Sequence, residues 1–251
     1  MTSSLFLVFL ALLVPAAFLA IVPPARAAAS AVIQNDSMWI DSIGTLHIVG
    51  EVRNSGAGWL TFVEVTGTLR DSGNAIVDVV FTFTSLRYVP PNIAAPFDLM
   101  ETDTAKSARV QSYTLLLDYQ ESPEVPQKLV VMNAAQSTNS LGWLEIVGEV
   151  QNNADAVSAY TEVTGTFYDA QGKVAYVGFT FTSPSEIPAG AISPFKLSII
   201  GSERSSKVAQ YTLFAESTTS GFTSTPETPW PGIFMAVVLA VGVVALRRKR
   251  A

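Results

Sequence analysis

The sequence predicts an all-β protein of two tandem antiparallel β-sandwich domains, flanked by an N-terminal and a C-terminal hydrophobic helix. Three observations predict it: an internal repeat at an offset of 98 residues, a hydrophobic alternation of period two inside each copy, and apolar runs at the two ends of the chain. The chain has 251 residues, of which 49% are hydrophobic and 14% charged. This length accommodates one or two domains.

The N-terminal segment has the pattern of a signal peptide. Leu5 to Val22 is an uncharged apolar run, and small residues follow it up to Ser30. We expect residues 1–27 to be the signal peptide, with cleavage after Ala27. Met1 to Ser4 contains no Lys or Arg, and eighteen apolar residues are also enough to span a bilayer. An uncleaved anchor is therefore the alternative.

The repeat divides the middle of the chain into residues 31–120 and 128–216. Val49 to Val52 aligns with Val147 to Val150, and the match continues without a gap as far as Leu115 and Leu213. A period near 100 residues is typical of tandem domains and too long for a solenoid of short units. Between the copies, Gln120 to Gln127 carries two prolines that break the strand pattern.

Five runs in each copy alternate like half-buried strands. In the first run Leu46, Ile48 and Val52 share one face, which leaves His47, Glu51 and Arg53 on the outward face. The later runs give the inward sets Val63, Val65 and Leu69; Val79, Phe81 and Phe83; Phe97 and Leu99; and Tyr113, Leu115 and Leu117. The third run thereby places Thr82 and Thr84 outward.

Turn residues separate the runs, as in the segments that begin at Asn54, Asp71 and Asp169. Five or six short strands in about 95 residues, with hardly any helical period, favour a small immunoglobulin-like sandwich.

Each copy resembles the FxLyD domain, an extracytoplasmic immunoglobulin-like sandwich of secreted and membrane-anchored prokaryotic proteins. The second copy carries the better match, in Val147-x-Glu149-Val150-x-Asn152, Thr166-Phe167-Tyr168-Asp169 and Pro194-Phe195. The first copy has Leu69-Arg70-Asp71 where the second has Phe167-Tyr168-Asp169. The resemblance implies a fold and a place outside the membrane, and it supplies no catalytic residue.

The C-terminal part reads as a stalk, a membrane helix and a basic tail. Residues 217–231 are rich in Ser, Thr and Pro, a composition that stays extended. Residues 232–246 form a short transmembrane helix candidate, and residues 247–251 carry four basic groups that the positive-inside rule holds in the cytoplasm. The domains are therefore expected outside the membrane, at the cell surface.

The same segment resembles PGF-CTERM and PEF-CTERM sorting signals, which archaeosortase or exosortase enzymes process. The resemblance rests on Pro231, Gly232, the apolar helix and the basic cluster Arg247, Arg248, Lys249 and Arg250. Thr228 to Gly232 departs from the usual Pro-Gly-Phe or Pro-Glu-Phe core. A plain single-pass anchor that is left intact is the alternative.

Composition excludes several functions. Residues 28–231 carry ten basic against twenty-one acidic side chains, a balance that repels nucleic acid. With no Cys and one His, thiol nucleophiles, disulfides, Cys-bearing zinc sites and His-centred triads are excluded or nearly so. We expect no catalytic residue, no cofactor and no metal.

Some residues nevertheless have a chemical alternative. Glu51 with Glu64, and Glu149 with Glu162, would form acid–base pairs of a hydrolase if they faced each other, although solvated strand-face carboxylates are the simpler interpretation. Asp71 and Asp169 are cation ligands or, more simply, caps of their own turns. His47 is expected to be a surface histidine, because no Ser and Asp lie near it in a motif.

Two features point to surface recognition. Asn35 begins the one Asn-x-Ser/Thr sequon and is a candidate glycosylation site. Trp59, Phe62 and Tyr160 are available to stack on a sugar or a protein, or else they cover the end of a sandwich core.

Together these patterns predict a non-enzymatic cell-surface protein that displays two immunoglobulin-like domains for binding, adhesion or envelope architecture. Its expected partners are the membrane and a protein or glycan at the surface, with no nucleic acid. The alternative is an extracytoplasmic accessory or ligand-binding subunit of a membrane complex.

Overall fold

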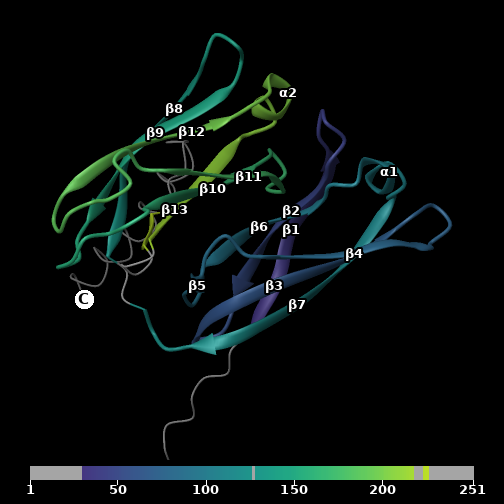
Figure 1. The fold of residues 1–251 in the computed structure, drawn as a ribbon, viewed down its shortest axis with the longest axis horizontal. Helices are drawn as coiled ribbons and strands as arrows, with labels where there is room; N and C mark the ends of the chain where they lie inside the picture. The colour runs from purple at the N-terminus through teal and green to yellow at the C-terminus, as the bar shows by residue number, and fades with distance from the viewer. Residues whose placement is uncertain (1–29, 126–127, 218–222, 226–251) are drawn as a thin grey trace, which may run out of the picture.

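The computed structural model describes residues 30–125, 128–217 and 223–225 and is all-β, with several small antiparallel sheets (Figure 1). The first repeat contains β1 (Ala31–Ile40), β2 (Leu46–Asn54), β3 (Trp59–Arg70), β4 (Ile76–Phe83), β5 (Tyr88–Val89), β6 (Ala94–Glu101), the short helix α1 (Thr104–Ser107) and β7 (Ser112–Ser122).

The first repeat is a β-sandwich. One sheet has the order β1-β2-β6, and in the other β3 pairs with β4, β5 and β7. The side chains between the sheets form one buried cluster that includes Leu46, Ile48, Val52, Val65, Leu69, Phe97 and Leu99. The inward positions predicted for the first, second and fourth runs therefore lie in this core.

The second repeat has the same arrangement. It contains β8 (Leu129–Thr138), β9 (Leu144–Asn152), β10 (Glu162–Tyr168), β11 (Val174–Phe181), β12 (Ile192–Ile199), the short helix α2 (Ser202–Ser205) and β13 (Gln210–Glu216). Its sheets have the orders β12-β9-β8 and β11-β10-β13-β14, where β14 (Thr223–Thr225) pairs with β13. β14 lies within the range expected to be a stalk.

A buried asparagine pins the same corner in each repeat. Nδ2 of Asn54 donates to the carbonyls of Gly58 and Val89 at 2.8 and 2.9 Å, and its Oδ1 accepts the Gly56 N–H at 3.0 Å. Asn152 repeats this pattern at the corresponding corner. Both side chains are fully buried. They are therefore structural residues and not merely turn formers.

The predicted hairpins form as expected. Oδ1 of Asp71 accepts the N–H groups of Gly73 and Ala75, both at 3.0 Å, and Asn74 adopts a φ of 63°. Asp169 caps the equivalent hairpin, where Gly172 has a φ of 76°. These turns need residues that tolerate positive φ, which Asn and Gly do.

The face predicted for the third run was wrong. Phe81 and Phe83 are exposed, together with Val79, whereas Thr84 is buried and donates its hydroxyl to the Leu86 carbonyl. The strand has apolar residues at both parities, including Val77 and Val80, which pack on the core from the inner side. Period two therefore did not determine which side of β4 faces inward.

Each repeat also contains a strand that the sequence pattern did not resolve. β1 and β8 open the repeats, and each has a bulge, at Gln34/Ser37 and at Met132/Ala135. Asn35 and Asn133 sit in these bulges with φ of 58° and 53°. A bulge interrupts the alternation that identifies a strand.

The expected signal peptide (1–27), most of the stalk, the transmembrane helix (232–246) and the basic tail (247–251) lie outside the described residues, as do Pro231, Gly232, Arg247, Arg248, Lys249 and Arg250. Neither of the helices in the described ranges has the length and hydrophobicity to cross a membrane.

Close packing at Gly50 gives the first prediction. A Cβ there would lie 2.7 Å from Cζ of Phe97, whose ring is fully buried. We expect Gly50→Ala to lower the free energy of unfolding by about 2 kcal/mol, because the ring has no free volume into which to move. Urea denaturation measures this. Gly73→Ala, whose Cβ has its nearest contact at 3.4 Å, should change stability by less than about 0.5 kcal/mol; equal effects would contradict the packing argument.

Candidate functional site

The two repeats pack against each other. Several buried or partly buried polar side chains of the described chain lie at this junction. β11 lies against the outer face of the sheet formed by β1, β2 and β6 (Figure 1). Val49, Val174 and Val177 form a small buried cluster there, with Trp39 and Tyr168 packed on it. The outward face of the first predicted strand is therefore covered by the second repeat.

Glu51 is buried in this junction. Its Oε1 accepts a hydrogen bond from the Tyr168 hydroxyl, and its Oε2 accepts the side-chain amides of Gln34 and Asn35, both at 3.3 Å. Burial, reinforced by the nearby Glu51 charge, raises the pKa of Tyr168, so that its hydroxyl remains a donor. The carboxylate is thus used to join the repeats.

His47 is also buried, in a stack at the same junction. Its ring is parallel to that of Trp39, with ring centres 4.1 Å apart, and its Nδ1 lies 2.9 Å from Oδ2 of Asp98. The guanidinium carbon of Arg204 lies 4.0 Å from the centre of the Trp39 ring and 5.1 Å from that of Tyr176. The surface position predicted for His47 was therefore wrong: the side chain is buried under Trp39, which itself packs against the second repeat.

The second repeat replaces this histidine pair by a pair of inverted polarity. Glu145 and Lys196 occupy the positions of His47 and Asp98, and Lys196 Nζ lies 2.8 Å from Glu145 Oε1. Asn139 stands in place of Asp41, whose Oδ2 lies 3.6 Å from His47 Nε2, and donates to Glu145 Oε1 at 3.0 Å. The histidine arrangement is thus a variant of a structural pair.

A second part of the junction contains two partly buried acidic groups, Glu216 and Glu162. Oε2 of Glu216 accepts the Arg87 backbone N–H at 2.9 Å, and Phe214 on the same strand packs on the core of the first repeat. Burial raises the pKa of Glu216 to about 7, opposed by Arg87 and reinforced by Glu162, which is its partner in the β10–β13 register. Burial also raises the pKa of Glu162.

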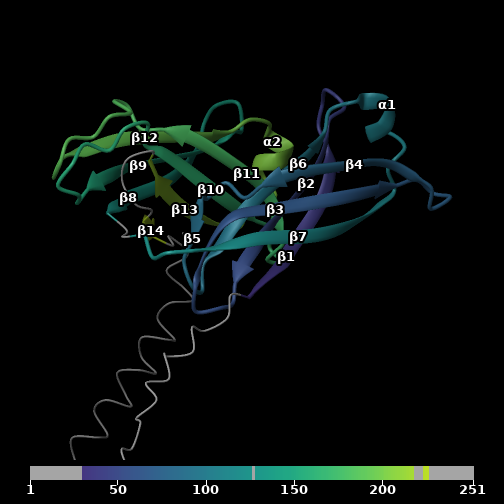
Figure 2. The same cartoon turned by 60° about the horizontal axis from the view of Figure 1, so that its bottom comes forward.

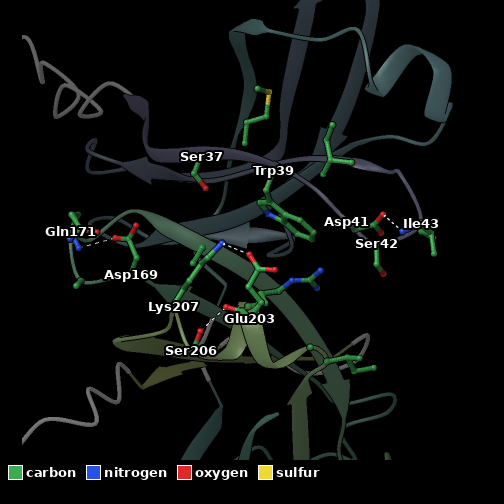
Figure 3. Close-up of a pocket in the computed structure, with 17 residues that line it drawn as sticks. Ser37, Trp39, Asp41, Ser42, Ile43, Asp169, Gln171, Glu203, Ser206 and Lys207 are labelled. Carbon is green, nitrogen blue, oxygen red and sulfur yellow. Dashed lines mark hydrogen bonds and ion pairs between the residues drawn. The ribbon is translucent and has the colours of Figure 1, made fainter. Parts of the chain in front are cut away.

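A cleft of about 990 Å³ opens beside the stack. Figure 3 shows Trp39 between β1 and α2, with the β10–β11 hairpin at one side. The charged groups at its rim are largely satisfied locally, since Lys207 Nζ lies 3.3 Å from Glu203 Oε1 and Asp169 caps its own turn. Ile43 and Ile200 are exposed at its edges. Such a cleft is suited to binding a ligand through shape and apolar contact more than to catalysing a reaction.

The Arg204–Trp39 contact gives the second prediction. A guanidinium over an indole contributes about 1 kcal/mol at a partly buried site. In a double-mutant cycle of Arg204→Met and Trp39→Leu, we expect a coupling free energy of that size in urea denaturation. A cycle of Arg204→Met with Trp143→Leu, whose indole has no such partner among the described contacts, should show no coupling. Zero coupling in the first cycle would contradict the contact.

The structure separates the carboxylates proposed as acid–base pairs. Glu51 lies in the sheet of β1, β2 and β6, whereas Glu64 lies on the outer face of the opposite sheet, where it pairs in register with Phe83. Glu149 and Glu162 are separated in the same way in the second repeat. Neither pair is brought together, and the interpretation of Glu51 as a solvated carboxylate was also wrong.

For Asp71 and Asp169, the hydrogen bonds fit the capping alternative. Both carboxylates are engaged by backbone N–H groups of their own turns. Within the described ranges, no group of three or more His, Cys, Asp and Glu side chains is placed to hold a metal ion.

Asn35 has a structural part in the bulge of β1. Its amide nitrogen, the atom that a glycan would modify, donates to Glu51, and Asn133 makes the equivalent bond to Glu149 at 2.7 Å. Glycan attachment would leave this nitrogen a single hydrogen to donate.

Exposed aromatic side chains recur at equivalent places. Phe62 and Tyr160 are 65% and 66% exposed, each with a φ of 48°, so they do not cover the core ends. Phe81 and Phe83 form an edge-to-face pair with ring centres 6.2 Å apart, and Phe179 and Phe181 repeat it at 6.0 Å. Trp59 is half-buried in β3.

Sequence reasoning missed the junction itself. The sequence pattern did not identify β1, a strand of the junction. The other surface of the junction is a sheet face that alternation alone predicts to be exposed to solvent. Among aligned repeat positions, His47 and Asp98 change to Glu145 and Lys196, a paired change in charge, but each pair lies within a single repeat and gives no signal for the junction. Such a paired change is expected for residues in contact.

No family model and no curated protein matches the sequence. Among solved structures, a red sea bream transglutaminase matches 80% of this chain and 31% of its own, with 12% identity and a TM-score of 0.25. The exo-chitosanase CsxA of Amycolatopsis orientalis matches 77% of this chain and 26% of its own, with 9% identity and a TM-score of 0.29. The chain thus spans less than a third of the length of these proteins. TM-scores this low carry no argument about activity.

Proposed function

We propose that this chain is a non-enzymatic cell-surface protein that displays two immunoglobulin-like domains of the FxLyD kind outside the membrane, packed into one body, for binding, adhesion or envelope architecture. The residues 31–120 and 128–216 are its two domains. The C-terminal segment attaches them to the membrane, or is processed by a sortase-like enzyme.

One observation carries the non-enzymatic part. Glu51, His47 and Tyr168 are the side chains best suited to acid–base catalysis, and all three make hydrogen bonds or ring contacts at the junction. A carboxylate held by three donors and an imidazole between an indole and an aspartate are committed to packing. These buried polar groups therefore hold the two packed repeats together.

The chain enters the packed repeats at β1 and leaves them at β13, and the positions of these two points support attachment to one surface. Ser30, where β1 is entered, accepts the N–H groups of Ser55 and Gly56 at 2.8 and 3.0 Å. Asn54, the neighbour of Ser55, is bonded to Val89, close to Arg87, which donates to Glu216 at the end of β13. In Figure 2, β1 begins and β13 ends on the lower side of the body. The apolar C-terminal segment can then meet the membrane on this side, as can the N-terminal segment in the alternative in which it is not cleaved.

The alternative, an accessory or ligand-binding subunit of a membrane complex, is favoured by the cleft beside Trp39. Its volume of about 990 Å³ is that of a ligand site, and its lining combines apolar side chains such as Ile43 and Ile200 with charged ones such as Glu203 and Lys207. A stoichiometric partner captured by cross-linking in native membranes would support this alternative.

The chain contains no cysteine, which makes single-cysteine labelling an unambiguous test of display. Ser72→Cys and Ala189→Cys place thiols at exposed turns of the two repeats. We expect both to react with a membrane-impermeant maleimide on intact cells, whereas Ala251→Cys reacts only after permeabilisation or is lost with a processed tail. Labelling of the two turns only after permeabilisation would overturn the proposal.

A further inference from the structure

The junction uses two different surfaces, and each repeat possesses both. We call the outer face of β10, β11 and β13, together with α2, the donor surface of the second repeat. The outer face of β1, β2 and β6 is the acceptor surface of the first repeat. By the repeat alignment, the first repeat has an equivalent donor surface on β3, β4, β7 and α1, and the second has an equivalent acceptor surface on β8, β9 and β12.

The donor surface of the first repeat is left open. Val177 and Phe214, which the junction covers, are 8% and 6% exposed. Their counterparts in the first repeat, Val79 and Leu116, are 54% and 70% exposed. The apolar character of this surface is thus kept in the repeat where nothing in the described part of the chain covers it.

The acceptor surface of the second repeat is open in the same way. Val49 is fully buried at the junction, whereas its counterpart Val147 is 42% exposed. In both Figure 1 and Figure 2, the sheet of β8, β9 and β12 and the sheet of β3, β4 and β7 lie on opposite sides of the body. One chain therefore presents one open donor surface and one open acceptor surface, facing apart.

We propose that a second copy of this chain covers these surfaces: the donor surface of the first repeat docks on the acceptor surface of the second repeat of the next molecule, in the geometry of the junction within the chain. The contact is heterologous, so each added copy leaves the same two surfaces open. Such assemblies grow into filaments, or into rings if the rotation closes.

Charge complementarity supports this partner. At the junction within the chain, Tyr168 donates to Glu51. At the contact between chains, the repeat equivalents are Arg70 and Glu149, which carry opposite charges. A hydrogen bond from a hydroxyl to a carboxylate in one place is therefore replaced by an ion pair in the other.

A second set of charges matches as well. Tyr176 lies close enough to Asp98 for the carboxylate to act on its pKa. The equivalents are Asp78 and Lys196, again of opposite charge. Each already has a partner in its own repeat, Asp78 with Lys106 and Lys196 with Glu145. When the surfaces meet, the four charges alternate in sign.

The inference rests on the proposed function only in that it names the partner of the displayed domains. Its test is independent of topology. Full-length protein in detergent is examined by sedimentation velocity over its whole soluble concentration range. We expect the wild type to form a concentration-dependent series of oligomers.

Charge reversal with mixing distinguishes the proposed contact from other association. Arg70→Glu opposes Glu149 with a like charge, and Glu149→Arg opposes Arg70, so each variant alone should remain monomeric. In an equimolar mixture, position 70 of one variant meets position 149 of the other. Opposite charges then face each other at every contact, so the mixture should form oligomers again. Misfolded variants would not recover on mixing.

Asp155→Arg reverses an exposed charge outside both surfaces and should assemble like the wild type. A monomeric wild type, or oligomers that persist in the single variants, would overturn the inference while leaving the display proposal standing. If the two turns cannot be labelled on intact cells but the wild type still assembles, the display proposal is overturned and the inference stands.

Discussion

Asn54→Ala is expected to lower the free energy of unfolding by about 3 kcal/mol. The substitution removes three hydrogen bonds at a fully buried corner and leaves the carbonyls of Gly58 and Val89 without their side-chain donor. A buried group left unsatisfied costs about 1–3 kcal/mol. Asn152→Ala should have the same effect in the second repeat, where the bonds recur.

Urea denaturation followed by tryptophan fluorescence measures both variants. Asn153→Ala is the matched control, because this neighbour is exposed, and it should shift the free energy by less than about 0.5 kcal/mol. If Asn54→Ala behaves like the control, the corner is not held by this side chain. If the substitution lowers the free energy of unfolding of only one repeat, the two repeats unfold separately.

Glu216→Gln is expected to remove a pH dependence from the stability of the wild type. Burial raises the pKa of Glu216 to about 7 in the folded state, against about 4.3 for an unperturbed glutamate. Between these values the native state binds more protons, so the stability present below about pH 4 is lost as the pH rises through about 7. The wild type should lose about 2 kcal/mol over this range.

The glutamine variant keeps a side-chain oxygen for the Arg87 N–H but has no charge to bury. It should be more stable than the wild type above pH 7 and nearly equal to it at pH 4, as measured by urea denaturation at several pH values. Asp118→Asn changes the equivalent residue of the first repeat, which is exposed, and should leave the wild-type slope intact. A wild type whose stability rises from pH 5 to 7 would contradict the raised pKa of Glu216.

Much of the fold could be predicted from alternation and duplication. Leu46, Ile48 and Val52 share one parity of β2, opposite to the polar residues His47, Glu51 and Arg53, which fixes the face of β2 that lies in the core. β4 has apolar residues at both parities, so the same argument failed there. The bulges at Asn35 and Asn133 hid β1 and β8 for a related reason: they break the period on which the prediction depends.

The junction was less predictable, because burial between repeats does not alter local periodicity. His47 and Glu51 alternate with core residues and look like solvent-facing groups in any single strand. Their burial depends on a surface that is 117 residues away in sequence, as in the bond from Tyr168 to Glu51. Comparison of the two copies shows the paired change of His47 and Asp98 to Glu145 and Lys196, which reports a contact within each repeat and not the contact between the repeats.

The docking of the second repeat on the first is the claim on which the account depends, since the pH dependence and the assembly between chains both follow from it. Val49 and Val147 are equivalent residues, fully buried and 42% exposed, respectively. We would measure the maleimide reaction rates of Val49→Cys and Val147→Cys in full-length Arg70→Glu protein, in which no second copy covers position 147. The account predicts that the thiol at position 147 reacts many times faster than the thiol at position 49; equal rates would contradict it.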